Sequence, residues 1–483
     1  MRRAKIIATI GPKSHSKEVL KDLIRAGMDV ARLNFTHSDH AFHQQSIANI
    51  RELSNEMNIP LAIMQDLQGI KIRTGSLKKG KAVRLVKGQD FFITTNSIEG
   101  TAEGVSTSYQ KLPKDVKAGD QVLLSDGLIE LQVVRSSASE VKCAVLMGGI
   151  LNQRQGINLP GVTISAPILS QKDLEDIDFG VRHAVDFIAL SFVRGPEDVL
   201  VLREELKKRE ADIPIIAKLE RPLAIKNLDT ILSVADGVMI ARGDLGVEMS
   251  AEKVPIIQKE IIRKANSKRK IVITATQMLE SMIQHHRPTR AEASDVANAV
   301  FDGTDALMLS AETAIGKFPV EVVSTMSKII AEAEKLEFTS PLLEKTEAGS
   351  LSFPEAVCNA AYYASRSTSS KSIIVFTQSG STARLISKYR PRAEIWACTP
   401  HKTISQRMSL YWGVRGIHMQ EIRGRSIFEL NIDQLIQELE KLLLERKLVE
   451  HEDNIIILSG APIVEQGHTS LMKLHSIKDN RQQ

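Results

Sequence analysis

The chain has 483 residues, 43% of them hydrophobic and 25% charged, which excludes a disordered or collagen-like chain. Lys and Arg total 63 against 58 Asp and Glu, giving a net charge of +5. This excess is dilute, and aromatic residues make up only 4% of the chain, so the composition argues against nucleic-acid binding. Small anionic substrates are a better match for the positive charge.

The sequence also lacks features that would place the protein in a membrane or outside the cell. No apolar run reaches the ~18 residues of a membrane-spanning helix, and the N-terminal residues lack the apolar segment of a signal peptide, so we expect neither. Cys143, Cys358 and Cys398 are too far apart for a disulfide framework or a zinc site. We therefore expect a protein of the reducing cytoplasm with no membrane partner.

Eight short apolar runs, each followed by a helix-like pattern, recur along the chain. They are rich in Val, Ile, Leu and Ala, as is typical of parallel strands covered on both faces. The runs are Ala4–Ile10, Val30–Phe35, Leu61–Asp66, Phe187–Phe192, Pro214–Glu220, Val238–Arg242, Ile271–Thr276 and Ala306–Ser310. Eight such β-then-α units predict an α/β fold built on a (β/α)8 TIM barrel. Ser16 and Gly27 are the expected caps of its first helix, and Thr289 with Glu292 forms a capping-box pattern.

Two regions depart from this rhythm. Between the third and fourth runs, short β-forming segments separated by Gly, Asp and Ser predict a small all-β domain inserted at the end of the barrel where a lid could act. After about Leu342, strand-like runs alternate with amphipathic segments and predict a doubly wound α/β domain. We expect a first barrel part over 1–69, an inserted β-barrel lid domain over 70–166, a second barrel part over 167–342 and a C-terminal α/β domain over 343–483.

Reactive side chains gather at the predicted strand ends, where barrel enzymes carry their catalytic groups. Any one of them could be an ordinary helix cap, but the whole set favours an active site. They include Thr9, Arg32, Asn34, Asp66, Ser191, Lys218, Glu220, Arg242, Asp244, Thr276 and Glu312.

Glu220 and Asp244 form the most specific pair, because they end consecutive strands and can share one Mg²⁺ ion. The alternative is an ion pair with Lys218 or Arg242. Lys218 lies two residues before Glu220 and so projects from the same strand face, where it could stabilise charge on a transferring phosphoryl group or an enolate. The turn beginning at Gly243 could receive an anion on its backbone N–H groups.

Longer motifs cover nearly the whole chain. They are Lys5–Pro12, Ala26–His37, Asp66–Gly75, Gly156–Gly161, Ala217–Glu220, Ala241–Gly246, Thr274–Met282, Pro288–Thr313 and Phe376–Pro391. In these segments the sequence closely resembles the pyruvate kinase family. The resemblance implies phosphoryl transfer from phosphoenolpyruvate to ADP, giving pyruvate and ATP, by a glycolytic and cytoplasmic homotetramer. A mutase or lyase acting on phosphoenolpyruvate, or a basic nucleic-acid-binding relative without activity, are the alternatives.

The resemblance also implies roles for individual residues. Arg32, Lys218 and Thr276 match catalytic positions, and Thr276 borders the face on which the enolate is protonated. The substrate-binding positions are Arg32, Lys218, Gly243, Asp244 and Thr276, and the ligands of Mg²⁺ or Mn²⁺ are Glu220 and Asp244. The nucleotide-binding positions are Asn34, His37 and Arg73, and the monovalent-cation positions are Asn34, Thr36, Asp66 and Leu67.

Three positions depart from the family pattern. Lys71 stands where many relatives carry a glutamate near the cation site, so its ammonium could replace K⁺; the alternative is that Lys71 points to solvent. Gln155 replaces a lysine that reaches nucleotide phosphate, which leaves the lid's nucleotide contact open. Ala311 replaces a glycine, a change we expect the backbone to tolerate.

A loop rich in hydroxyl groups follows a predicted strand near the C-terminus and precedes a helix expected to begin near Ala383. In the family this loop binds an allosteric sugar phosphate, and the alternative is ordinary helix capping. The candidate residues are Thr377, Ser379, Gly380, Ser381 and Thr382. The loop contains no lysine or arginine, which favours a monophosphate effector over a bisphosphate.

Overall fold

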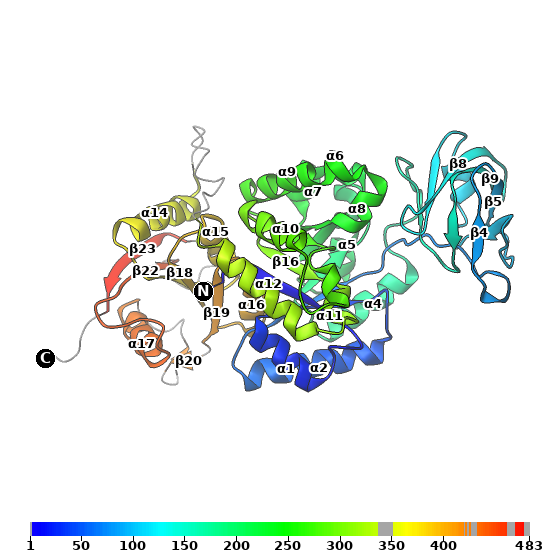
Figure 1. Ribbon diagram of the computed structural model, residues 1–483. Helices are drawn as coiled ribbons and strands as arrows, with labels where there is room; N and C mark the ends of the chain where they lie inside the picture. The colour runs from blue at the N-terminus through cyan, green and yellow to red at the C-terminus, as the bar shows by residue number, and fades with distance from the viewer. Residues whose placement is uncertain are drawn as a thin grey trace, which may run out of the picture. The chain divides into compact units, whose positions relative to one another are not determined.

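The computed structural model describes residues 2–336, 351–419, 421–422, 425–426, 432–460 and 469–477 (Figure 1). The chain forms two compact units. One comprises Met1–Gln65, His183–Ile188 and Ile262–Gln483, and the other comprises Asp66–Arg182 and Ala189–Ile261.

Eight strands form a closed barrel in the order β1-β16-β15-β14-β13-β12-β3-β2. They are β1 (Lys5–Ile10), β2 (Val30–Asn34), β3 (Ala62–Asp66), β12 (Phe187–Leu190), β13 (Ile215–Leu219), β14 (Gly237–Ala241), β15 (Ile271–Ala275) and β16 (Ala306–Leu309). Every residue of β1, β13, β14 and β15 is buried, as expected of strands covered on both faces. The predicted barrel is confirmed, and each predicted strand is matched to within two residues at either end.

The two barrel helices for which the sequence predicts caps lie where those caps place them. The Ser16 side chain accepts a hydrogen bond from the Val19 N–H at the start of α1 (Lys17–Ala26), and Gly27 ends that helix with a left-handed φ of 116°. The capping box of Thr289 and Glu292 opens α10 (Arg290–Phe301). The others are α2 (His40–Glu56), α4 (Gln171–Arg182), α5 (Pro196–Lys208), α6 (Pro222–Lys226), α7 (Leu228–Val234), α8 (Arg242–Glu248), α9 (Val254–Ser267), α11 (Ala311–Ala314) and α12 (Pro319–Ala333).

The segment between β3 and α4 is built almost entirely from strands, as predicted. One sheet has the order β11-β7-β8-β9-β5-β6 and a second pairs β10 with β4. The strands are β4 (Val83–Leu85), β5 (Asp90–Thr94), β6 (Gly104–Ser106), β7 (Gln121–Leu124), β8 (Ile129–Ser136), β9 (Glu140–Met147), β10 (Gly149–Leu151) and β11 (Ile157–Asn158). The sequence pattern missed β6, β10 and β11, which have at most three residues each, and the short helix α3 (Leu112–Asp115). Phe91, Leu124, Leu131 and Val145 belong to the segment's own hydrophobic core.

The C-terminal region contains a five-stranded sheet in the order β19-β18-β17-β22-β23. The first four strands are parallel, and β23 runs antiparallel to β22. The sheet strands are β17 (Ser372–Phe376), β18 (Glu394–Thr399), β19 (Val414–His418), β22 (Asn454–Ser459) and β23 (Leu471–Ser476), and the helices are α14 (Phe353–Ser367), α15 (Ser381–Lys388), α16 (Lys402–Arg407) and α17 (Ile432–Glu445). The predicted α/β domain is confirmed, although β23 was not predicted because none of its side chains is fully buried. The predicted boundary near Leu342 lies outside the described residues.

A buried ion cluster attaches this region to the base of the barrel. Asp305, the residue before β16, forms ion pairs with Lys388 at the end of α15 and with Arg390 (2.8 Å), and Lys388 also donates to the Asn266 side chain (2.9 Å). The side chains of Asp305, Lys388 and Arg390 are at most 2% exposed. Burial lowers the pKa of Lys388 to about 8 although the Asp305 carboxylate raises it. Lys388 therefore depends on the Asp305 carboxylate for its counter-charge.

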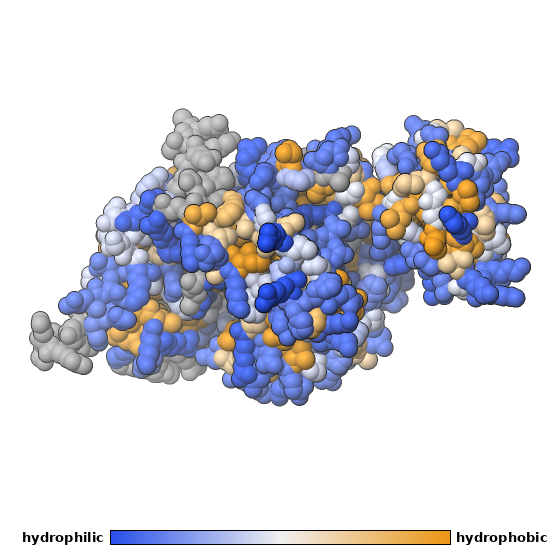
Figure 2. All heavy atoms as spheres, viewed as in Figure 1, coloured by the Kyte–Doolittle hydropathy of each residue, from blue (hydrophilic) through white to orange (hydrophobic). Residues whose placement is uncertain are grey.

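In the part of the chain that the structure describes, no helix is both long and apolar enough to span a bilayer. On the face seen in Figure 2, hydrophobic side chains lie in scattered patches among hydrophilic ones.

Candidate active site

Lys218 in β13 is the centre of a buried polar cluster at the ends of three neighbouring barrel strands. Its Nζ lies 3.1 Å from Asp66 Oδ1, 2.8 Å from Ser191 Oγ and 3.0 Å from Glu220 Oε1. The Lys218 residue is 9% exposed, and Asp66 is fully buried. The structure thus brings together four of the reactive residues that the sequence places at strand ends. The sequence indicated no role for Ser191. Its hydroxyl accepts from Lys218 and donates to the Leu67 carbonyl (2.7 Å), so it links the Lys218 side chain to the backbone just after β3.

Both carboxylate oxygens of Glu220 have a partner. Oε1 faces Lys218, and Oε2 accepts a hydrogen bond from the Phe192 N–H (2.7 Å), where the backbone is left-handed at φ 57°. Burial raises the pKa of Glu220, the charge of Asp244 raises it further, and Lys218 opposes both effects. The alternative ion pair between Lys218 and Glu220 is therefore present, and it coexists with the predicted proximity of the two acids.

Asp244 lies in the first turn of α8, which begins directly after β14. The turn predicted at Gly243 is thus the first turn of a helix that follows a barrel strand. Among the described residues no set of three His, Cys, Asp or Glu side chains is arranged to hold a metal. Mg²⁺, however, commonly takes only one or two carboxylates and completes its shell with substrate and water oxygens. Glu220 and Asp244, whose charges repel each other, form a donor set that fits this ion.

Sequence reasoning missed a second buried acid on α8. Glu248 is 3% exposed by its side chain, lies 3.8 Å from Arg221 and is hydrogen-bonded by the Asn158 side chain from β11. Burial raises the pKa of Glu248 to about 7. Its position four residues after Asp244, on the same face of one helix, was the available signal.

Other strand ends belong to the unit that contains β1, β2, β15 and β16. Arg32 is 7% exposed, and its Nη1 donates to Thr9 Oγ1 (2.9 Å). Thr276 follows β15 in the left-handed region at φ 67°, and its hydroxyl donates to the Ala275 carbonyl (2.6 Å). This conformation is strained for a β-branched residue, and such strain is found most often at functional sites.

The residues predicted to bind a monovalent cation are divided between the two units. Asn34 Oδ1 accepts from the Thr36 N–H (3.1 Å), which fixes the turn after β2. In the other unit Asp66 faces Lys218, and the Leu67 carbonyl accepts from Ser191. The Lys71 side chain is exposed.

The other residues predicted to contact nucleotide are more exposed to solvent. The His37 side chain is exposed. Arg73 is half-buried and donates to the Arg154 carbonyl (3.1 Å), while the Gln155 N–H donates to Thr74 Oγ1 (2.9 Å). Both contacts join residues 73–74 to residues 154–155, two stretches outside the named strands near the start and the end of the inserted segment.

Glu312 is a strand-end residue with a structural role. It is 2% exposed and accepts hydrogen bonds from the backbone of Ser310 (2.7 Å) and Leu279 (3.4 Å). Burial raises its pKa although these bonds oppose the shift.

The hydroxyl-rich loop after β17 forms a tight turn at the start of α15. Gly380 has a left-handed φ of 80°, and its N–H donates to Thr377 Oγ1 (2.9 Å). Ser379 is exposed and donates to Ser381 Oγ (3.0 Å), whereas Thr382 is buried and pairs with Thr469. The helix begins at Ser381, two residues earlier than predicted, so its first N–H groups lie within the loop.

A parallel eight-stranded barrel with acids, a lysine and an arginine at its strand ends defines a TIM-barrel enzyme. The family model "Pyruvate kinase, barrel domain" matches residues 1–323, and "Pyruvate kinase, alpha/beta domain" matches residues 355–475. The chain belongs to the pyruvate kinase family.

Relatives support this assignment over nearly the whole length. The chain is 45% identical over 482 residues to the pyruvate kinase of Staphylococcus aureus strain MRSA252, an alignment that covers 99% of this chain and 81% of that one. The pyruvate kinase of strain USA300 matches with the same identity and coverage. A crystal structure of a pyruvate kinase from Cryptosporidium parvum superposes with a TM-score of 0.92 at 40% identity, covering 99% of this chain and 96% of that chain.

Proposed function

We propose that this enzyme transfers the phosphoryl group of phosphoenolpyruvate to ADP, forming pyruvate and ATP, and that Lys218 and its acidic neighbours carry the chemistry. The observation that carries the proposal is the cluster in which a buried lysine touches Asp66, Ser191 and Glu220. Such a charge needs no rearrangement to stabilise an anion that develops beside it. The family assignment supplies the reaction, and it argues against the mutase, lyase and nucleic-acid-binding alternatives.

In the proposed reaction the bond between phosphorus and the enol oxygen breaks while a terminal phosphate oxygen of ADP bonds to phosphorus. Arg32 binds the phosphoryl oxygens, and Lys218 neutralises charge on the phosphoryl group and on the enolate oxygen. The enolate then takes a proton at its methylene carbon on the side bordered by Thr276. Backbone N–H groups at Gly243 and Asp244 orient the substrate carboxylate.

Glu220 and Asp244 are the residues that would hold Mg²⁺ or Mn²⁺. Such an ion supplies Lewis-acid charge that offsets the negative charge of substrate oxygens. Its charge would also offset the repulsion from Asp244 that, together with burial, raises the pKa of Glu220.

The reaction is tested by a coupled assay that follows pyruvate. We expect pyruvate to form from phosphoenolpyruvate only when ADP and Mg²⁺ are both present, with one ATP formed per pyruvate. Pyruvate production without ADP would contradict the proposal and favour a lyase or phosphatase.

We further propose that the enzyme works without K⁺ because the Lys71 ammonium takes the place of that cation. Lys71 lies at the start of the lid segment, and its exposed side chain would have to turn toward the cation site when substrates bind. We expect turnover in a bulky tetraalkylammonium salt to stay within about twofold of turnover in K⁺. Activity that collapses in that salt and returns with K⁺ would refute this, and a Lys71→Glu variant should acquire the K⁺ requirement.

The turn at Thr377–Thr382 is proposed to bind a sugar monophosphate that activates the enzyme. Hydroxyl groups and the first N–H groups of α15 lie together there, and Ser379 is exposed. We expect Ser379→Glu to abolish activation by glucose 6-phosphate or ribose 5-phosphate, because its carboxylate repels the phosphate, while basal turnover is unchanged. The matched variant Ser137→Glu, at an exposed serine of the inserted segment, should keep activation. Activation that survives in Ser379→Glu would place the effector elsewhere.

The homotetramer and the cytoplasmic location expected from the family also remain predictions. Cys143, Cys358 and Cys398 are buried free thiols, and burial raises the pKa of each to about 12, so none is poised to form a disulfide.

A further inference from the structure

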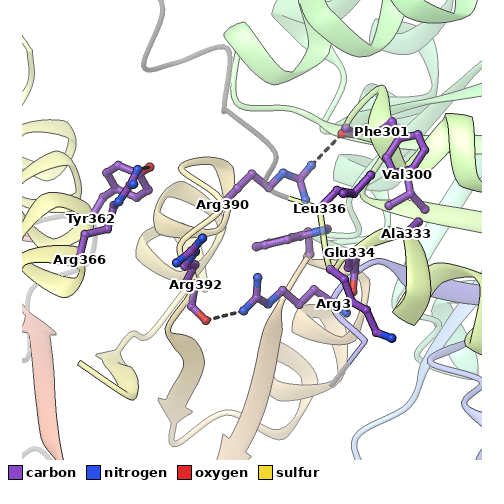
Figure 3. A pocket seen from close by; sticks show the side chains of 13 residues that line it. Arg3, Val300, Phe301, Ala333, Glu334, Leu336, Tyr362, Arg366, Arg390 and Arg392 are labelled. Atoms are coloured by element: carbon purple, nitrogen blue, oxygen red, sulfur yellow. Dashed lines mark hydrogen bonds between the residues drawn. The ribbon is translucent and has the colours of Figure 1, made fainter. Parts of the chain in front are cut away.

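A cavity of about 690 Å³ lies beside the ends of α10 and α12, the N-terminal Arg3 and the C-terminal α/β domain (Figure 3). Its volume is within the range of small-molecule sites. None of the strand-end residues described above lines it, and the turn at Thr377–Thr382 does not line it either. It is therefore separate from the two sites already proposed.

The lining of this cavity is strongly cationic. Arg3, Lys335, Arg366, Arg390 and Arg392 contribute to it, against the single lining carboxylate of Glu334. Figure 3 shows Arg3, Arg390 and Arg392 next to one another, with Arg366 on one side and Glu334 on the other.

The Glu334 carboxylate offsets part of this positive charge, because it interacts electrostatically with both Arg3 and Arg390 and is held in place by the backbone. Oε2 accepts from the Arg3 N–H (2.7 Å), and Oε1 accepts from the Ala4 N–H (2.7 Å). The Arg3 guanidinium donates to the Arg392 carbonyl, which anchors it at the cavity wall. One carboxylate does not balance all the lining cations, so the cavity keeps a positive field that an anion would complement.

Arg390 supplies the second, independent observation. Its side chain is 2% exposed, and its Nη2 donates to the Gly303 carbonyl (2.8 Å) and to Asp305 (2.8 Å). Its Nη1 is buried and has no hydrogen-bond partner among the described residues. A buried unsatisfied charged donor is costly, so a ligand oxygen that reached the Arg390 guanidinium from the cavity, with a small shift of that side chain, would relieve this cost.

The rest of the lining includes aromatic and aliphatic side chains. The guanidinium of Arg390 lies 4.5 Å from the ring centre of Trp412 and that of Arg3 lies 5.5 Å from it. Apolar lining residues are Val300, Phe301, Ala333 and Leu336. These surfaces would pack against an organic group, while the arginines bind a dianion.

We propose that this cavity binds a small phosphomonoester that carries a flat apolar group. A dianionic phosphate is favoured over a single carboxylate because the cations outnumber the one lining carboxylate. The apolar wall accounts for the organic part, which inorganic phosphate lacks.

Phenyl phosphate is a suitable probe, and Trp412 is a suitable reporter. The chain has two tryptophans, so Trp396→Phe leaves Trp412 as the only one. We expect a saturable change of Trp412 fluorescence on titration with phenyl phosphate, and an affinity about tenfold weaker for inorganic phosphate. Calorimetry on the unaltered chain measures the same affinity without relying on the Trp396→Phe variant.

The exposed arginines give the decisive variants. Arg366→Gln and Arg392→Gln should each weaken phenyl phosphate binding about tenfold, the loss expected for one charge-assisted contact. Arg25→Gln, at an exposed arginine on α1 outside the cavity, should leave the affinity unchanged, as should Ser379→Glu. No saturable response at millimolar probe, equal affinity in all the arginine variants, or loss of the response in Ser379→Glu would each overturn the proposal.

Discussion

Lys218→Met is expected to lower turnover by about 10²–10³-fold, the range seen when one preorganised group that stabilises developing charge is removed. Lys218 is the cation at the centre of the cluster, with Asp66, Ser191 and Glu220 all within 3.1 Å of its Nζ. Methionine keeps the volume of the side chain but removes the charge. The coupled pyruvate assay measures the change, and the loss should appear in kcat more than in KM because the charge is needed in the transition state.

Lys208→Met is the matched control. Lys208 is 67% exposed by its side chain and pairs on α5 with Glu205 (2.6 Å). An exposed ion pair of this kind contributes little, so turnover should be unchanged. If Lys218→Met kept turnover within threefold of the unaltered enzyme, the cluster would not be the catalytic centre.

Asp305→Asn is expected to destabilise the protein by about 3–5 kcal/mol, the cost of breaking a buried ion pair by removing one partner. Asp305 is the acid that pairs with both Lys388 and Arg390, and its Oδ2 also accepts from the Val272 N–H (2.8 Å). Asparagine keeps the shape of the side chain but leaves two buried cations without their counter-charge. Denaturant unfolding followed by circular dichroism measures the loss.

Two further variants serve as controls for Asp305→Asn. Asp22→Asn removes an acid from an exposed pair with Arg25 (3.6 Å) and should cost less than about 1 kcal/mol. Lys388→Met combined with Asp305→Asn should cost less than the two single changes together, because one uncompensated cation is gone. Equal losses in Asp305→Asn and Asp22→Asn would contradict the role of the cluster.

Local sequence patterns determined the barrel and its connections. The eight apolar runs predicted the strands because a parallel strand buried on both faces needs a continuous apolar segment. Ser16, Gly27 and the pair Thr289 and Glu292 located helix ends, since capping depends on residues within one turn. Strands of two or three residues, such as β11, lack enough residues to show a period.

The sequence predicted most of the residues that belong to the site but not which of them contact one another. Parallel strands end at a common rim, so Asp66, Lys218 and Glu220 could be expected near one another. Their roles came from likeness to the pyruvate kinase family. Glu248 was missed because an acid within a helix is normally exposed, and only the fold shows that it is buried.

By itself, then, the sequence determined the order of strands and helices, the inserted β segment and the family to which the chain belongs. The tertiary structure decided which distant groups meet: Lys218 with Ser191, Asp305 with Lys388, and the arginines with Trp412 around one cavity. The physical reason is that strand and helix formation depends on neighbours within a few residues, whereas burial, ion pairing and cavity shape depend on chain closure over long sequence separations. The total charge excess of +5 therefore says little about function. What matters is where the fold groups cations together.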